Sequence, residues 1–395
     1  MIWPLFILGG YVLGSVSPSY ILGRLLKGID IREHGTHNAG TVNVYQLLGL
    51  GPAVITAAFD LFKGLLAMLL GHLAGGSPLL VFLAGLAAVL GHVLPFYLRF
   101  RGGQGVATAT AILIYYLVVF YTHGWLPVAS LLLLAVSVLS FSYIGRKGEI
   151  VGSVVLPLLA VFVIVFKTPS PYLYFILSII VYILFINILN IRNQKLLRIS
   201  FLKEKGEIGW RLYIRPLAFL LVLFYLRADK KSALTLIGAV TLFFLLLDLA
   251  RLLSKKVNFF FFHKIKQVYR EKEYKTFSSI TIFLFAYFLT VLLFEKGIAV
   301  LATSYLTFGD FFSKLFGIQF GRKKIFEKTL EGSLAHLSAC LTAGYLLLRY
   351  VSIPVPTYLL GALIASLSEV LPLSVDDNFS VSLLSASTMY VLHLF

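Results

Sequence analysis

Asp60 and Lys63 stand one helical turn apart within an apolar run, and His92 stands near the end of the next such run. Side chains three positions apart on a helix share a face, so the acid and the base can pair. Ionisable groups inside apolar helices are costly to bury and are by default candidates for functional sites. We therefore predict that Asp60, Lys63 and His92 are catalytic. The alternative is a structural ion pair, or a lysine that reaches a lipid headgroup.

A glycine-rich turn follows His92 and leads into the next apolar run, with the sequence Arg101-Gly102-Gly103-Gln104-Gly105. Such a turn can present several backbone N–H groups at the positive end of a helix dipole, which suits an anionic group. With His92 and two arginines, Arg99 and Arg101, at its start, the sequence predicts a phosphate site built from these five residues.

The polar loop over residues 30–46 offers neutral hydrogen-bonding side chains between glycines that let the backbone turn. Loops on a rigid scaffold often carry binding residues. We predict that Thr36, Asn38 and Asn43 contact a substrate. A plain polar connector at the membrane surface is the alternative.

The second half of the sequence carries acids and bases at the ends of its apolar runs. Carboxylates and amide oxygens are ligands that Mg²⁺ prefers, and Lys and Arg suit a polyphosphate, so together they indicate metal-dependent phosphoryl transfer. The predicted metal ligands are Asp310, Glu331, Asp376 and Asp377, with Asn378 beside them in the catalytic set. The predicted phosphate-binding residues are Arg322, Lys324 and Lys328. The alternatives are a basic loop at the membrane surface and a helix N-cap at residues 376–377.

The composition indicates which elements must position these residues. The 395 residues are 59% hydrophobic and 13% charged, which excludes a disordered chain, a disulfide scaffold and an ordinary soluble enzyme. At about 20 apolar residues per span, the sequence predicts an all-α, polytopic membrane protein of about 14 spanning helices in two bundles of about seven. The expected spans are 3–26, 51–73, 79–98, 105–122, 126–144, 151–167, 171–191, 212–227, 232–252, 277–294, 297–308, 333–350, 354–371 and 379–395.

Lys and Arg gather in alternate loops, which predicts a cell-membrane orientation with the amino terminus outside and the active-site loops cytosolic. The cytosolic loops are expected at 27–50, 99–105, 253–276 and 309–332. The net charge of +17 then reflects loops that face anionic lipids, and we expect no nucleic-acid partner. The single cysteine, Cys340, excludes an internal disulfide and a cysteine-cluster metal site, and we expect no haem, flavin or zinc.

The longest polar break near the middle predicts a domain boundary. We expect a first domain at 1–195, a basic linker at 196–211 and a second domain at 212–395.

Over residues 1–195 the chain resembles the bacterial acyl-phosphate:glycerol-3-phosphate acyltransferases, an integral-membrane family with seven spans. The matching pieces are Gly14-Ser15 with Pro18, Asn38-x-Gly40-x-x-Asn43, Asp60-x-x-Lys63-Gly64, Gly91-His92 with Pro95, and Gly102-Gly103-x-Gly105-Val106-Ala107-Thr108. The resemblance implies that acyl phosphate and glycerol 3-phosphate are partners and that Asn190 belongs to the site.

Three positions differ from the family's pattern. Where the family has an arginine, a lysine and a histidine, this chain has Gln46, Gln104 and Asn187. Charged donors bind phosphate about twice as strongly as neutral ones. We therefore expect weak or no acylation of glycerol 3-phosphate, with another acceptor or a non-catalytic scaffold as the alternatives.

Over residues 211–395 the chain resembles the CTP-dependent lipid kinases, which act on dolichol, phytol or diacylglycerol and are related to phosphatidate cytidylyltransferases. The matching pieces are Arg270-x-x-Glu273, Gly309-Asp310, Gly317, Gly321, Lys328-Thr329-x-Glu331-Gly332-Ser333, and Glu369 followed by Asp376-Asp377-Asn378. The resemblance implies CTP as co-substrate, Mg²⁺, a lipid alcohol as acceptor, and Ser333 as a binding residue.

The two halves together predict a two-module transferase of phospholipid metabolism, in which an acyltransferase-type domain is fused to a CTP-dependent lipid kinase. The alternatives are a scaffold role for one module and a lipid-binding or transport protein. Polar motifs at one membrane face and the lack of a visible inverted repeat disfavour a transporter.

Overall fold

The computed structural model describes residues 3–166, 169, 171–197, 215–264 and 271–394. The chain forms two compact units, one of residues 1–134 and 149–194 and the other of residues 135–148 and 195–395. Most of the linker predicted at 196–211, together with Arg211 and Arg270, lies outside the described residues.

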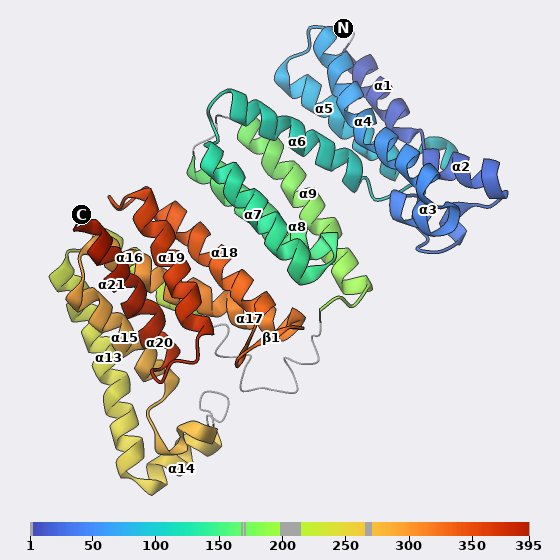
Figure 1. Cartoon of the computed structure of the whole chain (residues 1–395). Coiled ribbons are helices and arrows are strands. Elements are labelled where there is room, and N and C mark those ends of the chain that lie inside the picture. The colour runs from blue at the N-terminus through green and yellow to red at the C-terminus, as the bar shows by residue number, and fades with distance from the viewer. Residues whose placement is uncertain (1–2, 167–168, 170, 198–214, 265–270, 395) are drawn as a thin grey trace. The chain divides into compact units, whose positions relative to one another are not determined.

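The first unit is a bundle of helices in which α5 packs along α1 and α4, α4 packs on α6, and α6 packs on α9 (Figure 1). Its elements are α1 (Trp3–Ser15), α2 (Pro18–Lys27), the 3-10 turn η1 (Ile31–Glu33), α3 (Thr41–Leu48), α4 (Leu50–Leu73), α5 (Pro78–Val93), η2 (Phe96–Leu98), α6 (Val106–Thr122), α8 (Gly148–Val165) and α9 (Tyr172–Asn193). The helix α7 (Val128–Gly145) is divided between the two units.

Small residues bring α1 and α5 into close contact. A Cβ atom at Gly14 would collide with the backbone of Ala88, and one at Gly91 would collide with the carbonyl of Tyr11. Glycine at helix crossings permits this approach of two backbones in membrane proteins. The approach places the end of α5, which carries His92, against the break between α1 and α2.

That break lies inside the predicted span 3–26. Pro18 begins α2 at its first position, where its missing N–H is tolerated, and the Ser17 hydroxyl accepts a hydrogen bond from the Tyr20 N–H. Proline cannot supply the N–H that would continue α1. The span is therefore two helices joined at residues 16–17, and the carbonyl group of Val16 is left outside the helical ladder.

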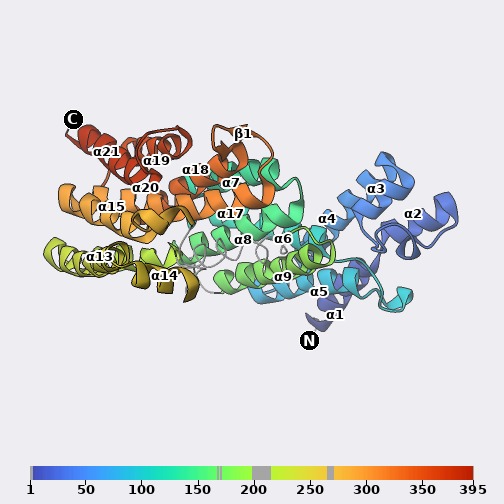
Figure 2. The same ribbon diagram turned by 90° about the horizontal axis from the view of Figure 1, so that it is seen from below.

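Within its described residues, the second unit consists of helices and one short hairpin (Figure 2). Its elements are η3 (Arg215–Ala218), α12 (Phe219–Arg227), α13 (Lys230–Leu253), α14 (Lys255–Lys264), η4 (Glu271–Lys275), α15 (Ser279–Leu293), α16 (Lys296–Ser304), the π turn η5 (Tyr305–Gly309), α17 (Asp310–Phe320), β1 (Lys324–Ile325), β2 (Lys328–Thr329), α18 (Leu330–Leu347), α19 (Val355–Val370), α20 (Asp377–Phe379), the π turn η6 (Ser380–Leu384) and α21 (Ser385–His393). The strands pair antiparallel, with Lys324 opposite Thr329. Residues 298–304 of α16 are all buried, so this helix lies at the centre of the unit.

The prediction of a loop over 309–332 is wrong for its first part. Residues 296–320 form one helical stretch, since α16 passes through the π turn η5 directly into α17. Polar residues made this segment look like a loop, but Asp310 and Lys314 lie one turn apart and pair on the helix surface. The remaining part holds the β1–β2 hairpin and the first turn of α18.

The all-α membrane fold is confirmed. Seven helices of the described chain are long and apolar enough to cross a membrane: 4–27, 50–73, 78–98, 128–145, 148–165, 172–193 and 230–253. Shorter apolar helices occupy 106–122, 216–227, 279–293 and 355–370. Six of the seven long helices therefore belong to the first half of the sequence, whereas apolar helices of the second half are mostly shorter than a full span.

Candidate functional site

Lys63 is the centre of a buried polar cluster in the first unit. Its Nζ atom lies 2.7 Å from Oδ1 of Asp60 and 2.6 Å from Nδ1 of His92, and it donates to the carbonyl of Val16 at 3.3 Å. The side chains of Asp60, Lys63 and His92 are all buried. The predicted pairing of Asp60 with Lys63 is confirmed, and the structure adds His92 from α5 and the carbonyl exposed by the α1–α2 break. The catalytic role of the three residues stays a prediction.

The glycine turn packs directly on this cluster. The N–H of Gly103 donates to the carbonyl of His92 at 3.1 Å, and the N–H of Gly102 donates to that of Val93 at 3.0 Å. A Cβ atom at Gly103 would collide with Nε2 of His92. These two N–H groups therefore donate to carbonyl groups at the end of α5, and the expectation that they point at an anion is wrong. Glycine is needed here because the turn lies in contact with the imidazole and the backbone.

The next position of the turn makes a side-chain pair with α9. The amide of Gln104 donates to Oδ1 of Asn190 at 2.8 Å, and the amide of Asn190 donates back to Oε1 of Gln104 at 2.9 Å. The hydroxyl of Tyr182 donates to the carbonyl of Gln104 at 2.6 Å. Gly105 has a φ of 66° and ends the turn, and α6 begins after it without a side-chain cap. The predicted residues Gln104 and Asn190 thus lie together.

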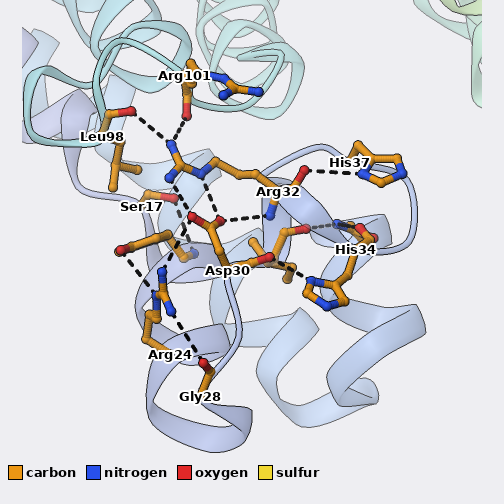
Figure 3. Close-up of polar contacts among 12 residues, drawn as sticks. Ser17, Arg24, Gly28, Asp30, Arg32, His34, His37, Leu98 and Arg101 are labelled. Atoms are coloured by element: carbon orange, nitrogen blue, oxygen red, sulfur yellow. Dashed lines mark hydrogen bonds and ion pairs between the residues drawn. The ribbon is translucent and has the colours of Figure 1, made fainter.

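Arg32 fastens the segment before the glycine turn to the loop at residues 28–37 (Figure 3). Its Nη1 atom donates to the carbonyls of Leu98 at 2.9 Å and Arg101 at 2.8 Å. Its Nε and Nη2 atoms donate to the two carboxylate oxygens of Asp30 at 2.9 and 2.6 Å. The hydrogen bonds from the Arg32 side chain lower the pKa of Asp30 and outweigh its partial burial. This contact was not among the sequence-based predictions, although the Asp-x-Arg spacing could have suggested the pair.

The segment that Arg32 holds is strained. Arg99 and Phe100 have φ angles of 56° and 57°, in the left-handed region that non-glycine residues seldom adopt. Such conformations persist only where surrounding contacts impose them. The guanidinium of Arg101 is exposed and points away from Arg32 in Figure 3. The predicted phosphate-binding residue Arg101 is therefore available to a ligand from solvent.

Asn43 organises the predicted substrate loop from within. Its amide donates to the carbonyls of Ile31, His34 and Asn38, and its Oδ1 accepts from the N–H of Thr36 at 2.8 Å. The side chain is buried, so the expectation that Asn43 contacts a substrate is not supported by its contacts. The side chain of Thr36 is exposed and that of Asn38 is half-buried, and neither has a hydrogen bond to another described residue.

Lys328 is the centre of a second polar cluster, in the second unit. Its Nζ atom lies 3.1 Å from Oε1 of Glu369 and 2.6 Å from Oδ2 of Asp377. Ser313 of α17 donates to the same Glu369 oxygen at 2.9 Å. Burial alone would lower the pKa of Lys328, but the neighbouring carboxylates of Glu369 and Asp377 raise it above its usual value. The cluster joins α17, β2, α19 and α20.

The four carboxylates predicted to bind a metal do not gather in the structure. Asp310 pairs with Lys314, Glu331 with Arg322, and Asp377 with Lys328. Asp376 accepts from the backbone and side chain of Asn378, as the N-cap alternative predicted. In the described ranges no three His, Cys, Asp or Glu side chains are placed to hold a metal ion. The prediction of a four-carboxylate metal site is wrong, because each acid has a nearby base or N–H partner.

Three of the predicted phosphate-binding residues of this unit make other contacts or none. Arg322 donates to both Glu331 oxygens through its side chain and backbone. The Ser333 hydroxyl donates to the carbonyl of Thr329 at 3.1 Å, inside the start of α18. Lys324 is exposed on β1. Lys328 is the predicted base that the structure brings to other candidate residues.

Glu369 and His336 are two candidates that the predicted site set omitted. Glu369 is buried and its Oε2 atom has no hydrogen-bond partner in the described structure. His336 is also buried; its Nδ1 lies 2.9 Å from Oγ of Ser366, and its Nε2 has no such partner. Gly309 packs against this imidazole, where a Cβ atom would collide. Both residues interrupt apolar runs of the sequence, which is the signal that could have identified them.

Comparisons with known proteins extend over the first half of the chain. The profile of the family "Glycerol-3-phosphate acyltransferase" matches residues 4–197. A protein named glycerol-3-phosphate acyltransferase from Shouchella clausii is 39% identical over 42% of this chain and 80% of its own length. One named glycerol-3-phosphate acyltransferase 2, from Moorella thermoacetica, is 37% identical over 44% of this chain and 84% of its own length.

A crystal structure of PlsY (YgiH), an integral membrane glycerol 3-phosphate acyltransferase in its glycerol 3-phosphate form, is also similar. It is 26% identical, covers 49% of this chain and 92% of its own, and has a TM-score of 0.40.

Proposed function

Because the chain belongs, through residues 4–197, to the glycerol-3-phosphate acyltransferase family, we propose that its first unit transfers an acyl group from an acyl phosphate to a hydroxyl of a glycerol-type acceptor. The observation that carries the proposal is the buried Asp60–Lys63–His92 cluster against the glycine turn. Acyl phosphate and glycerol 3-phosphate, or a related polyol, are the proposed partners.

The roles of the residues follow from their contacts. Lys63 and Asp60 both lie beside Nδ1 of His92, at 2.6 and 3.2 Å, and the other ring nitrogen, Nε2, is the one that the glycine turn approaches. The uncapped first turn of α6 and the exposed Arg101 supply donors for one phosphate group. Attack of the acceptor hydroxyl on the carbonyl carbon forms the ester bond and breaks the bond to phosphate, which leaves with the hydroxyl proton.

The test is an acyl-transfer assay of the purified full-length chain with palmitoyl phosphate and a panel of glycerol-type acceptors. We expect ester product from wild type and its loss in His92→Ala. His72→Ala is the matched control, since His72 ends α4 away from the cluster. Product formation that survives His92→Ala at the wild-type rate would refute the assignment.

For the second unit we propose CTP-dependent phosphorylation of a lipid alcohol such as a polyprenol, phytol or diacylglycerol. The support is the Lys328 cluster, in which Glu369 and Asp377 pair with one ammonium group and Ser313 donates to Glu369. When a nucleotide binds, the ammonium group of a lysine that pairs with two carboxylates can pair with a phosphate instead. The carboxylates do not fit a resident metal site, so we propose that Mg²⁺ enters as the counter-ion of CTP.

The kinase proposal is tested with labelled CTP and a panel of lipid alcohols, followed by separation of the lipids. We expect label in one alcohol, and loss of that label in Glu369→Gln. Glu327→Gln is the matched control because Glu327 is exposed in the β1–β2 hairpin. Absence of labelled lipid from every alcohol would refute the kinase function and leave a scaffold role for this unit.

We also propose that the protein lies in a cell membrane with its amino terminus outside, and that residues 196–211 link an acyltransferase domain at 1–195 to a kinase domain at 212–395. The basic loops support this orientation. Labelling of cysteines introduced at Gln46 and Lys324 in sealed vesicles of both orientations tests it. Equal accessibility of the two sites is expected, and opposite accessibility would refute it.

A further inference from the structure

We propose that the side-chain pair between Gln104 and Asn190 makes the acyl acceptor of the first unit an uncharged polyol rather than a phosphorylated one. The inference rests on the proposed acyl-transfer function and names the substrate class of that same site. Glycerol is the simplest acceptor of this class.

The side-chain amides of Gln104 and Asn190 are hydrogen-bonded to each other in both directions. Each amide gives one N–H to the other's oxygen, at 2.8 and 2.9 Å, so the two planar groups face each other. The Tyr182 hydroxyl, which donates to the Gln104 carbonyl at 2.6 Å, fixes the backbone below the pair. The pair therefore joins the start of α6 to the end of α9, beside the turn that contacts His92.

Asn187 adds a third neutral amide to the same end of α9. It stands one helical turn before Asn190 and packs against Gly152 of α8, where a Cβ atom would collide with its amide nitrogen. Gln104 and Asn190 are half-buried and Asn187 is buried. This end of the site is thus lined by amides that are partly accessible to a ligand.

The formal charge of the site is too low for two phosphate groups at once. The charges of Asp60 and Lys63 cancel, and the three amides are neutral. Arg101 and the start of α6 can hold one phosphate, which the acyl donor itself brings. A second phosphate would add about −1.5 to −2 charges at pH 7, and no described cation pairs with the amides to compensate for them.

Amides suit a neutral hydroxyl because they can donate to its oxygen and accept its hydrogen. A hydroxyl can replace one of the two hydrogen bonds of the pair without leaving a buried group unpaired. The reaction is balanced with such an acceptor: the ester C–O bond forms, the anhydride C–O bond breaks, and inorganic phosphate leaves with the hydroxyl proton.

The experiment compares glycerol with glycerol 3-phosphate as acceptor for palmitoyl phosphate, using the purified full-length protein. For wild type we expect a higher kcat/KM with glycerol. Gln104→Lys adds a cation and should shift the ratio at least tenfold toward glycerol 3-phosphate. Gln104→Met breaks the pair without adding charge and should lower transfer to glycerol with no gain for the phosphorylated acceptor.

Gln194→Lys is the matched control. Gln194 lies one turn beyond Asn190, and its amide contacts Glu149, so the same substitution places a cation near α9 but outside the pair. We expect its acceptor ratio to equal that of wild type. Melting temperatures of all variants show whether they fold.

The possible failures are distinguishable. Wild type that prefers glycerol 3-phosphate, or a ratio that Gln104→Lys leaves unchanged in a folded variant, would overturn this inference alone. A wild-type protein that transfers no acyl group to either acceptor would overturn the proposed function and the inference with it.

Discussion

The ammonium nitrogen of Lys63 lies 2.6 Å from Nδ1 of His92, although 29 positions separate the two residues in the sequence. A carboxylate oxygen of Asp60 and the carbonyl of Val16 complete its surroundings. The nitrogen therefore has three polar neighbours, which equals the number of hydrogens on an ammonium group. This arrangement explains how a lysine can be buried within the helices of a membrane protein.

Lys63→Met should destabilise the first unit strongly, because it removes the cation that pairs with the buried carboxylate of Asp60. Loss of one member of a buried ion pair costs about 3–5 kcal/mol. The measurement is the melting temperature of the purified protein in detergent. The double variant Asp60→Asn/Lys63→Met should recover a large part of the loss. A single variant as stable as wild type would contradict the prediction.

Gly103→Ala should lower acyl transfer by about tenfold or more, equivalent to ~1.4 kcal/mol of lost transition-state stabilisation. The added methyl group would collide with His92 and with the carbonyl of Ala39. Gly51→Ala is the control, since nothing lies within 4 Å of its Cβ position in α4. Initial rates with saturating acyl phosphate provide the measurement, and equal rates for the two variants would exclude a role for the close packing.

Acid should weaken the contact between Asp30 and Arg32. Hydrogen bonds from Arg32 lower the pKa of Asp30 in the folded state. Its stabilising contribution is therefore complete above the unfolded pKa, about 4, and is lost as the pH falls through the lower folded value. Melting temperatures measured from pH 6 to pH 3 should fall less steeply for Asp30→Asn than for wild type. Glu33→Gln, which alters an exposed acid of the same turn, should follow wild type.

Lys328→Met should abolish CTP-dependent labelling of lipid and lower the melting temperature, because Glu369 is then buried without its cation. Lys324→Met is the matched control on the paired strand, where the side chain is exposed. A lysine that only supplies positive charge to the loop would give the same result at both positions. Equal effects would therefore refute a specific role for Lys328.

The sequence predicted contacts within one helix better than contacts between helices. The spacing of Asp60 and Lys63 was sufficient to predict their pair, since helical geometry alone brings them together. Their contact with His92 depends on how α4 and α5 pack, which the spacing of residues does not specify. The same is true of Gln104 and Asn190, which lie 86 positions apart.

The predicted metal site failed for an electrostatic reason. From the sequence, the acids were expected to bind a metal and the bases to bind phosphates, as two separate sets. In the structure the sets neutralise each other, as in the pairs Glu331 with Arg322 and Asp377 with Lys328. At partly buried positions, an acidic and a basic side chain that lie close together stabilise each other's charged forms. Without coordinates, the pairing between distant elements could not be assigned.

The π turn η5 changes the rotational phase of the helix that contains it. A π turn accommodates one extra residue within a helix, and an α-helix advances about 100° per residue. The turn at 305–309 therefore rotates α17 by about that angle relative to α16. It lets one continuous helix direct residues 298–304 into the apolar core and Ser313 toward Glu369. Removal of a single residue from this turn would restore a regular helix and rotate Ser313 away from Glu369.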